Sequence, residues 1–93
     1  MEIKLEFENT TTRLAGNPYG KDIYDSQVKG KYEDFSEPLI IVFPDNITKV
    51  ASSFVQGFFT FLVSEIGYSG VFEKVTIKSS SDDISQKIME RIR

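Results

Sequence analysis

The run LIIVF at residues 39–43 constrains the fold more than any other segment of the chain. All of its residues are apolar and most are β-branched, a composition typical of a strand that is buried on both faces. Pro38 precedes the run and Pro44 follows it, and proline interrupts helices and central strands alike. We therefore expect a strand at 39–43 in the centre of a β-sheet.

Two other segments alternate apolar and polar residues, which is the pattern of a strand with one buried face. Ile3, Leu5 and Phe7 alternate with charged residues over positions 2–8. The segment VFEKVTIK at 71–78 returns to the same period, and its valines and isoleucine mark the face expected to be buried. We expect a strand in each segment.

Helical spacing of apolar residues marks three segments. Residues 20–33 follow a turn rich in glycine, asparagine and proline, and the turn is expected to precede a helix there. Residues 54–66 carry phenylalanine, valine, leucine and isoleucine at three- and four-residue intervals. We expect Gly67 to end this second helix in the left-handed conformation. Isoleucines recurring every four residues predict a last helix at 84–92.

Two local features within these segments have structural interpretations. Gly57 lies inside the second helix, where glycine costs ~1 kcal/mol relative to alanine, so we expect it to allow another backbone to approach closely. Asp82 and Asp83 could form a metal or acid–base site. They stand in SSSDD just before the last helix, and we favour the interpretation that they complement the helix dipole there.

The elements follow one another in the order strand, helix, strand, helix, strand, helix. Strand–helix–strand connections favour parallel pairing and a right-handed crossover. We therefore predict an α/β fold, a small sandwich that forms a single domain over residues 1–93, with a central buried strand at 39–43. Helices that cover mainly one face of the sheet would leave the other face or an edge available to a partner.

The residue types that the chain lacks exclude much chemistry. It contains no cysteine, histidine or tryptophan, so it has no disulfide, no Cys or His metal site and no Ser-His or Cys-His nucleophile pair. No phosphate-binding glycine loop is present. An enzyme would have to use carboxylates, lysine, tyrosine or serine, and no activated set of these stands together. We expect a non-enzymatic protein without a metal or a cofactor.

Charge and hydropathy bear on partners and location. The net charge is −3 and the basic residues are scattered, which argues against nucleic-acid binding because that rests on lysine and arginine meeting phosphates. No apolar run reaches the length of a membrane span. The first residues, MEIKLEFE, do not have the pattern of a signal peptide. We expect a cytoplasmic protein with neither a membrane nor a nucleic acid as partner.

Two adjacent serines, Ser52 and Ser53, stand directly before the phenylalanine-rich helix. Ser53 and Gln56 match the S-x-x-Q capping box, in which the two side chains each satisfy a free backbone donor. On this interpretation Ser53 is a helix cap worth ~1 kcal/mol. A helix N-terminus also hosts anions well, so the same position would accommodate a phosphoryl group. The sequence pattern alone is compatible with both roles.

Two stretches resemble a known family, PLIIVFPDNITKVASSFVQGFF at 38–59 and KVTIKSSSDDISQKIMERI at 74–92. Together they resemble the STAS domain of anti-sigma factor antagonists. The chain is more similar to the STAS-like domains of unknown function found in many small bacterial and phage proteins. The resemblance covers roughly residues 14–93, and its most specific part is the Ser-Phe pair within ASSF.

The resemblance implies a phosphorylation switch. In STAS antagonists, the loop between this strand and this helix carries a serine that a partner kinase phosphorylates, and that kinase is also the anti-sigma factor. Ser52 and Ser53 are the matching positions, with Ser53 the better match to the second serine of the Asp-Ser-Ser-Gly-Leu motif. This chain departs from that motif, since Ala51 replaces the aspartate and Phe54 and Val55 replace the glycine and leucine.

We therefore expect a regulatory, protein-binding domain that docks a partner, such as a kinase or ATPase of the anti-sigma-factor type. Docking would use the loop and helix start around residues 44–56, and phosphorylation of Ser53 or Ser52 could gate it. The residues expected to contact the partner are Asp45, Asn46, Thr48, Lys49, Ser52, Ser53 and Gln56. The alternative is a small inhibitor, encoded by a phage or mobile element, that blocks a host factor without a switch.

Overall fold

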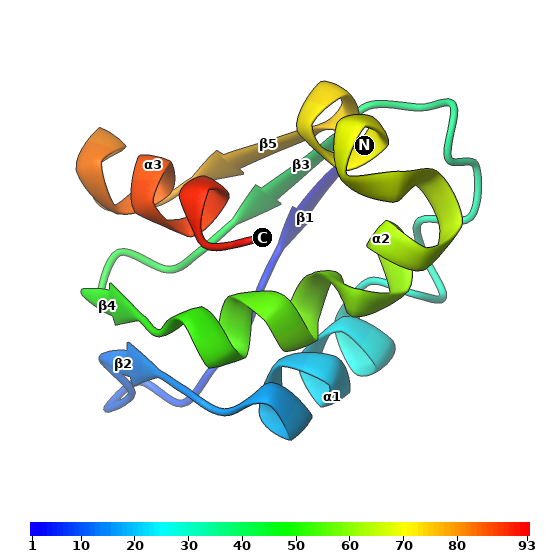
Figure 1. Ribbon diagram of the computed structural model, residues 1–93. Coiled ribbons are helices and arrows are strands. Elements are labelled where there is room, and N and C mark those ends of the chain that lie inside the picture. Colours follow the sequence, from blue (N-terminus) through cyan, green and yellow to red (C-terminus); the bar gives the residue numbers. More distant parts are fainter.

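The computed structural model describes residues 1–93 and contains three helices and five short strands (Figure 1). In chain order the elements are β1 (Glu2–Lys4), β2 (Arg13–Leu14), α1 (Asn17–Gln27), β3 (Leu39–Val42), β4 (Lys49–Val50), α2 (Ser52–Lys74), β5 (Val75–Lys78) and α3 (Asp82–Glu90). The predicted α/β class is confirmed. The two-residue strands β2 and β4 were not predicted.

The strands form two parallel sheets. The main sheet has the order β1-β3-β5, and β2 pairs with β4 in the second sheet. β3 is therefore the central strand, as its apolar run predicts. β1 and β3 are joined through α1, and β3 and β5 through α2, so each parallel pair has a helical crossover.

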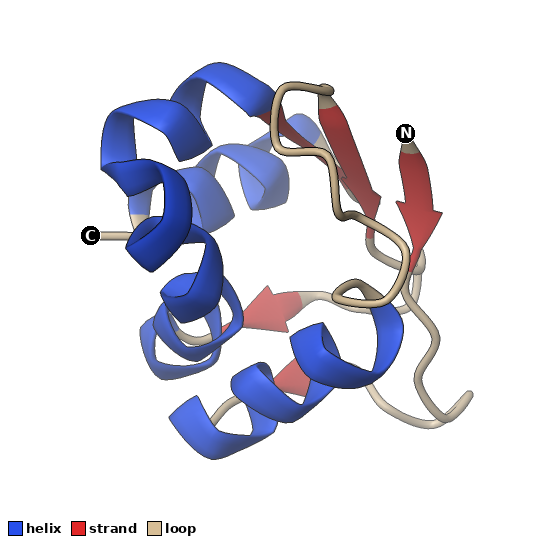
Figure 2. Cartoon of the chain, turned by 90° about the vertical axis from the view of Figure 1, so that its right-hand side faces the viewer, coloured by secondary structure: helices blue, strands red, loops and turns tan.

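The main sheet buries only one face. Ile3, Ile41 and Ile77 lie side by side in the register and are buried. On the opposite face, Val42 is only partly covered and stands between two exposed lysines of the neighbouring strands. Figure 2 shows the helices gathered on one side of this sheet.

The prediction that residues 39–43 are buried on both faces is therefore wrong for Ile40 and Val42. The exposed face carries an ion pair that crosses β3, with 3.6 Å between Lys78 Nζ and Glu2 Oε1. Long charged side chains can cover apolar surface with their aliphatic stems. This covering explains how a strand so rich in apolar residues tolerates one open face.

Helix α1 starts and ends earlier than the predicted range of 20–33. Asn17 and Pro18, interpreted as part of a turn, open the helix instead. The fixed φ of proline suits the first helical turn. Backbone N–H groups in that turn have no intrahelical acceptor, so the absence of an N–H on proline costs no hydrogen bond. Gly16 precedes the helix with φ 102°, a backbone conformation that favours glycine.

Helix α2 is longer than expected. Gly67 has the positive φ expected of it, 72°, but its ψ of 170° lies outside the predicted left-handed helical conformation. The helix is interrupted there, and a further helical segment follows across a kink. The strand predicted at 71–78 is wrong for residues 71–74, which are helical, and correct for β5. Val71 belongs to this helical segment and is buried there. Its burial therefore reflects a helix, although the alternating pattern of 71–78 suggested a strand.

Helices α1 and α2 pack so closely that the backbone of each contacts a glycine of the other. A Cβ atom on Gly57 would collide with the Asn17 backbone, and one on Gly20 would collide with the Phe54 backbone. The close approach predicted for Gly57 is confirmed. Because both helices follow strands of one parallel pair, their N-terminal ends lie at the same end of the molecule (Figure 1).

Candidate partner-binding site at the start of α2

The predicted contact residues lie on the turn after β3, on β4 and on the first turns of α2. Asn46 Nδ2 donates to the carbonyl oxygens of Thr11 at 2.6 Å and Asn9 at 3.3 Å. Thr48 Oγ1 donates to the Thr12 carbonyl at 3.2 Å. Both side chains therefore hold the segment before β2 in place, while Asp45 is exposed.

Ser53 is not a helix cap. Ala51 occupies the N-cap position of α2, and no side chain caps this helix. Ser53 Oγ instead accepts a hydrogen bond from the Gly16 backbone N–H at 3.0 Å. Gln56, the other half of the predicted capping box, donates through Nε2 to the Arg93 carbonyl at 3.2 Å. The helix begins two residues too early for the box, so both side chains reach distant segments instead.

The N-terminal turns of α1 and α2 meet at Ser53. Gly16 is the N-cap residue of α1, and Ser53 lies in the first turn of α2. Ser52 and Ser53 are both exposed. The two helix ends are therefore joined by a hydroxyl that faces solvent.

The electrostatics of these two helix ends differ from those of α3. Neither α1 nor α2 has an acidic residue in its first turn or a side-chain cap. In α3, Ser81 Oγ accepts from the Ile84 N–H, and Asp82 and Asp83 complement the dipole, as predicted for that helix start. The first turns of α1 and α2 thus carry no negative side chain to offset the positive end of their dipoles.

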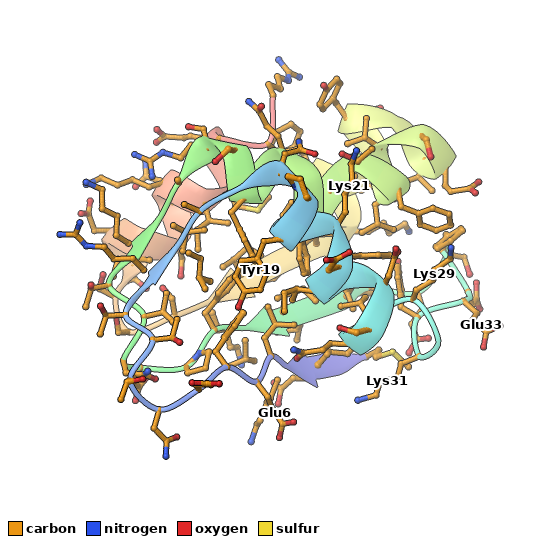
Figure 3. All side chains as sticks on the ribbon, turned by 90° about the horizontal axis from the view of Figure 1, so that it is seen from below. Glu6, Tyr19, Lys21, Lys29, Lys31 and Glu33 are labelled. Carbon is orange, nitrogen blue, oxygen red and sulfur yellow. The ribbon has the colours of Figure 1, made fainter.

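Tyr19 is an exposed aromatic residue beside this junction. It lies in the first turn of α1, is 40% exposed, and packs edge-to-face on Phe54 with 5.5 Å between ring centroids. Figure 3 shows Tyr19 lying along α1.

Three cationic side chains lie together where β4 faces α3. Lys49 is exposed on β4, Lys87 comes from α3, and Arg91 is the C-cap residue of α3. Arg91 Nη1 donates to the Val50 carbonyl at 2.6 Å. Sequence reasoning missed the contribution of α3, although Lys87 and Arg91 stand four residues apart and so share one helical face.

The groups with perturbed pKa values lie elsewhere. Burial raises the pKa of Tyr24, and it raises that of Tyr32, whose hydroxyl donates to the Glu37 carbonyl. Hydrogen bonds from Ser36 lower the pKa of Asp34. No group of three or more His, Cys, Asp or Glu side chains is placed to hold a metal ion.

Comparisons with family models, curated proteins and solved structures give no match to this chain. None of the helices is both long enough and apolar enough to span a bilayer.

Proposed function

We propose that this chain is a non-enzymatic regulatory domain, STAS-like in organisation, that binds a protein partner through the turn after β3, β4 and the first turn of α2. Phosphorylation of Ser52 or Ser53 gates that binding. The partner is a kinase or ATPase of the anti-sigma-factor type. The observation that carries this proposal is the Ser53–Gly16 hydrogen bond, which puts an exposed serine where two uncapped helix N-termini meet.

The two serines would act differently. The Ser52 side chain is exposed in the first helical position, so a phosphoryl group there would add about −1.5 to −2 charges without touching the contact to Gly16. A phosphoryl group on Ser53 would stand against the Gly16 N–H that its hydroxyl now accepts from. Modification of Ser53 would therefore also alter how the first turns of α1 and α2 are joined.

The surface around the serines suits a protein partner. Tyr19 is exposed beside Gly16, and tyrosine is enriched among residues that carry binding energy at interfaces. Asn46 and Thr48 fix the neighbouring segments through hydrogen bonds. A surface held in this way loses little conformational entropy when a partner binds.

The test is phosphorylation by a candidate partner kinase with ATP, followed by mapping of the phosphate by mass spectrometry. We expect phosphate on Ser52 or Ser53, and weaker partner binding by Ser53→Asp. Ser69→Asp is the matched control, since Ser69 is exposed in the helical segment beyond the α2 kink. The proposal fails if neither serine carries phosphate and Ser53→Asp binds the partner as the unmodified protein does.

A further inference from the structure

A crevice of about 300 Å³ lies between β4 and α3. Thr48, Lys49 and Val50 form one side of it, and Asp83, Lys87 and Arg91 line the other. Figure 1 shows α3 and β4 at the same end of the molecule, next to the start of α2. The crevice therefore shares β4 with the proposed docking surface but does not include the serine junction.

The crevice is cationic although the chain as a whole carries a net charge of −3. Lys49 and Arg91 form no ion pair, and Lys87 pairs only with Asp83 of its own helix, at 3.4 Å between Nζ and Oδ2. That pair is exposed, and exposed pairs of this spacing are weak. Arg13 lies opposite Lys49 in the β2–β4 register, so it adds a further positive charge next to the crevice.

Arg91 is held in a fixed position. Its guanidinium donates to the carbonyl of Val50, which lies 41 residues away in sequence, in a partly buried contact of 2.6 Å. The N–H groups of Lys49 and Ala51 donate toward the β2 side of β4. Because the backbone groups of successive residues in a strand point to opposite sides, the Val50 carbonyl faces away from β2. A guanidinium has five N–H donors, and the contact to Val50 leaves the others for an acceptor.

The lysines elsewhere in the chain are arranged differently. Lys21, Lys29 and Lys31 are spread along α1 and the turn after it, and in Figure 3 they point away from one another. Lys29 lies over the Phe61 ring at 4.8 Å. Lys21 and Lys29 border a hollow of about 280 Å³ between α1 and α2, but both come from α1 or the turn after it, and Asp25 lines the same hollow. The cations around β4 instead converge on one hollow from two elements.

We infer that the crevice between β4 and α3 binds a carboxylate side chain of an acidic segment of the protein partner. A planar carboxylate matches the fork of N–H donors on a guanidinium, and the lysines on the two walls complement its charge. The inference rests on the proposed function, since it names the chemistry of the segment that docks there. It adds Lys87 and Arg91 of α3 to the binding surface.

The experiment titrates the unphosphorylated full chain with an acetylated hexaglutamate peptide, followed by ¹H–¹⁵N NMR, with hexaglutamine as the uncharged control. We expect amide shifts at residues 48–50 and 83–91 with hexaglutamate only. The Lys49→Gln/Lys87→Gln variant should lose about tenfold in affinity, as expected for the loss of close charge pairs. The matched control is Lys21→Gln/Lys31→Gln, which changes the net charge equally and should stay within about twofold.

Shifts elsewhere, no shifts, or equal losses in both double variants would overturn the inference. Arg91→Lys supplies a further readout, because it keeps the charge and removes the fork, and it should weaken hexaglutamate binding severalfold. The titration uses no kinase and no phosphate. Failure of the serine switch would therefore leave the peptide result standing, and failure of the peptide to bind would leave the phosphorylation test unaffected.

Discussion

Ser53 Oγ accepts a hydrogen bond from the Gly16 N–H at 3.0 Å and thereby joins the first turns of α2 and α1. The two residues are 37 positions apart in sequence. The contact replaces the local cap that the serine-to-glutamine spacing predicts, so the hydroxyl stabilises tertiary structure rather than one helix. Its removal should affect the packing of two helices.

Ser53→Ala should lower the free energy of unfolding by about 1 kcal/mol, the usual net contribution of one intramolecular hydrogen bond. Ser52→Ala is the matched control, because the Ser52 side chain is exposed and makes no cap contact. Urea unfolding followed by circular dichroism measures both. Equal stability of the two variants would contradict the role given to the Ser53–Gly16 contact.

Gly57→Ala should destabilise the protein by about 2 kcal/mol or more, because overpacking between fixed backbones outweighs the better helix propensity of alanine. The added Cβ would collide with the Asn17 backbone, which cannot move as a side chain can. Gly30→Ala is the control, since a Cβ at Gly30 meets no atom within 4 Å. That variant should be neutral or slightly stabilising, and a similar loss at both positions would contradict the packing argument.

The apolar patterns predicted the main sheet and most of the core because burial and periodicity are local properties of the chain. The run at 39–43 is the central strand, and Ile88 and Ile92 of the last predicted helix are buried. The segment 71–74 was wrongly assigned to a strand. The positive φ at Gly67 admits a kink as well as an end, and a short alternating run cannot distinguish the two outcomes.

The candidate site was only partly predictable. Residues 44–56 are adjacent in sequence, so the turn, β4 and the start of α2 could be proposed together. The contacts from Gly16 and Arg91 come from segments 37 and 41 residues away, and only the parallel pairing of β2 with β4 and the packing of α3 bring them there. No local pattern carries that information.

Tyr24→Phe should leave stability at pH 7 unchanged or raise it by up to about 1 kcal/mol. The Tyr24 side chain is buried, and its hydroxyl has no hydrogen-bond partner. Removal of a polar group that makes no bond removes its desolvation cost. Thermal unfolding of the variant and the original chain at pH 7 measures the difference, and a loss above 1 kcal/mol would show that the hydroxyl is satisfied.

Alkaline pH should destabilise the protein through Tyr24 and Tyr32. Burial raises both pKa values above the tyrosine value of 10.0. A pKa that is higher in the folded state gives stability that is fully present below the unfolded pKa and is lost as pH rises through the folded pKa. The free energy of unfolding should therefore fall above about pH 10, and Tyr24→Phe should reduce that slope. Tyr68→Phe, at an exposed tyrosine, should not.

Gln27 bonds to the backbone of Glu6, two residues beyond the end of β1, and supplies the last prediction. Its side-chain oxygen accepts from the Glu6 N–H at 2.7 Å, and its Nε2 donates to the Glu6 carbonyl at 2.8 Å. The amide thus satisfies both the N–H and the carbonyl oxygen of Glu6, which no strand pairs. Gln27→Ala should lower stability by about 1–2 kcal/mol and speed hydrogen exchange of the Glu6 amide. Gln86→Ala, at an exposed position on α3, should change neither, and protection of Glu6 that survives in Gln27→Ala would assign it to another partner.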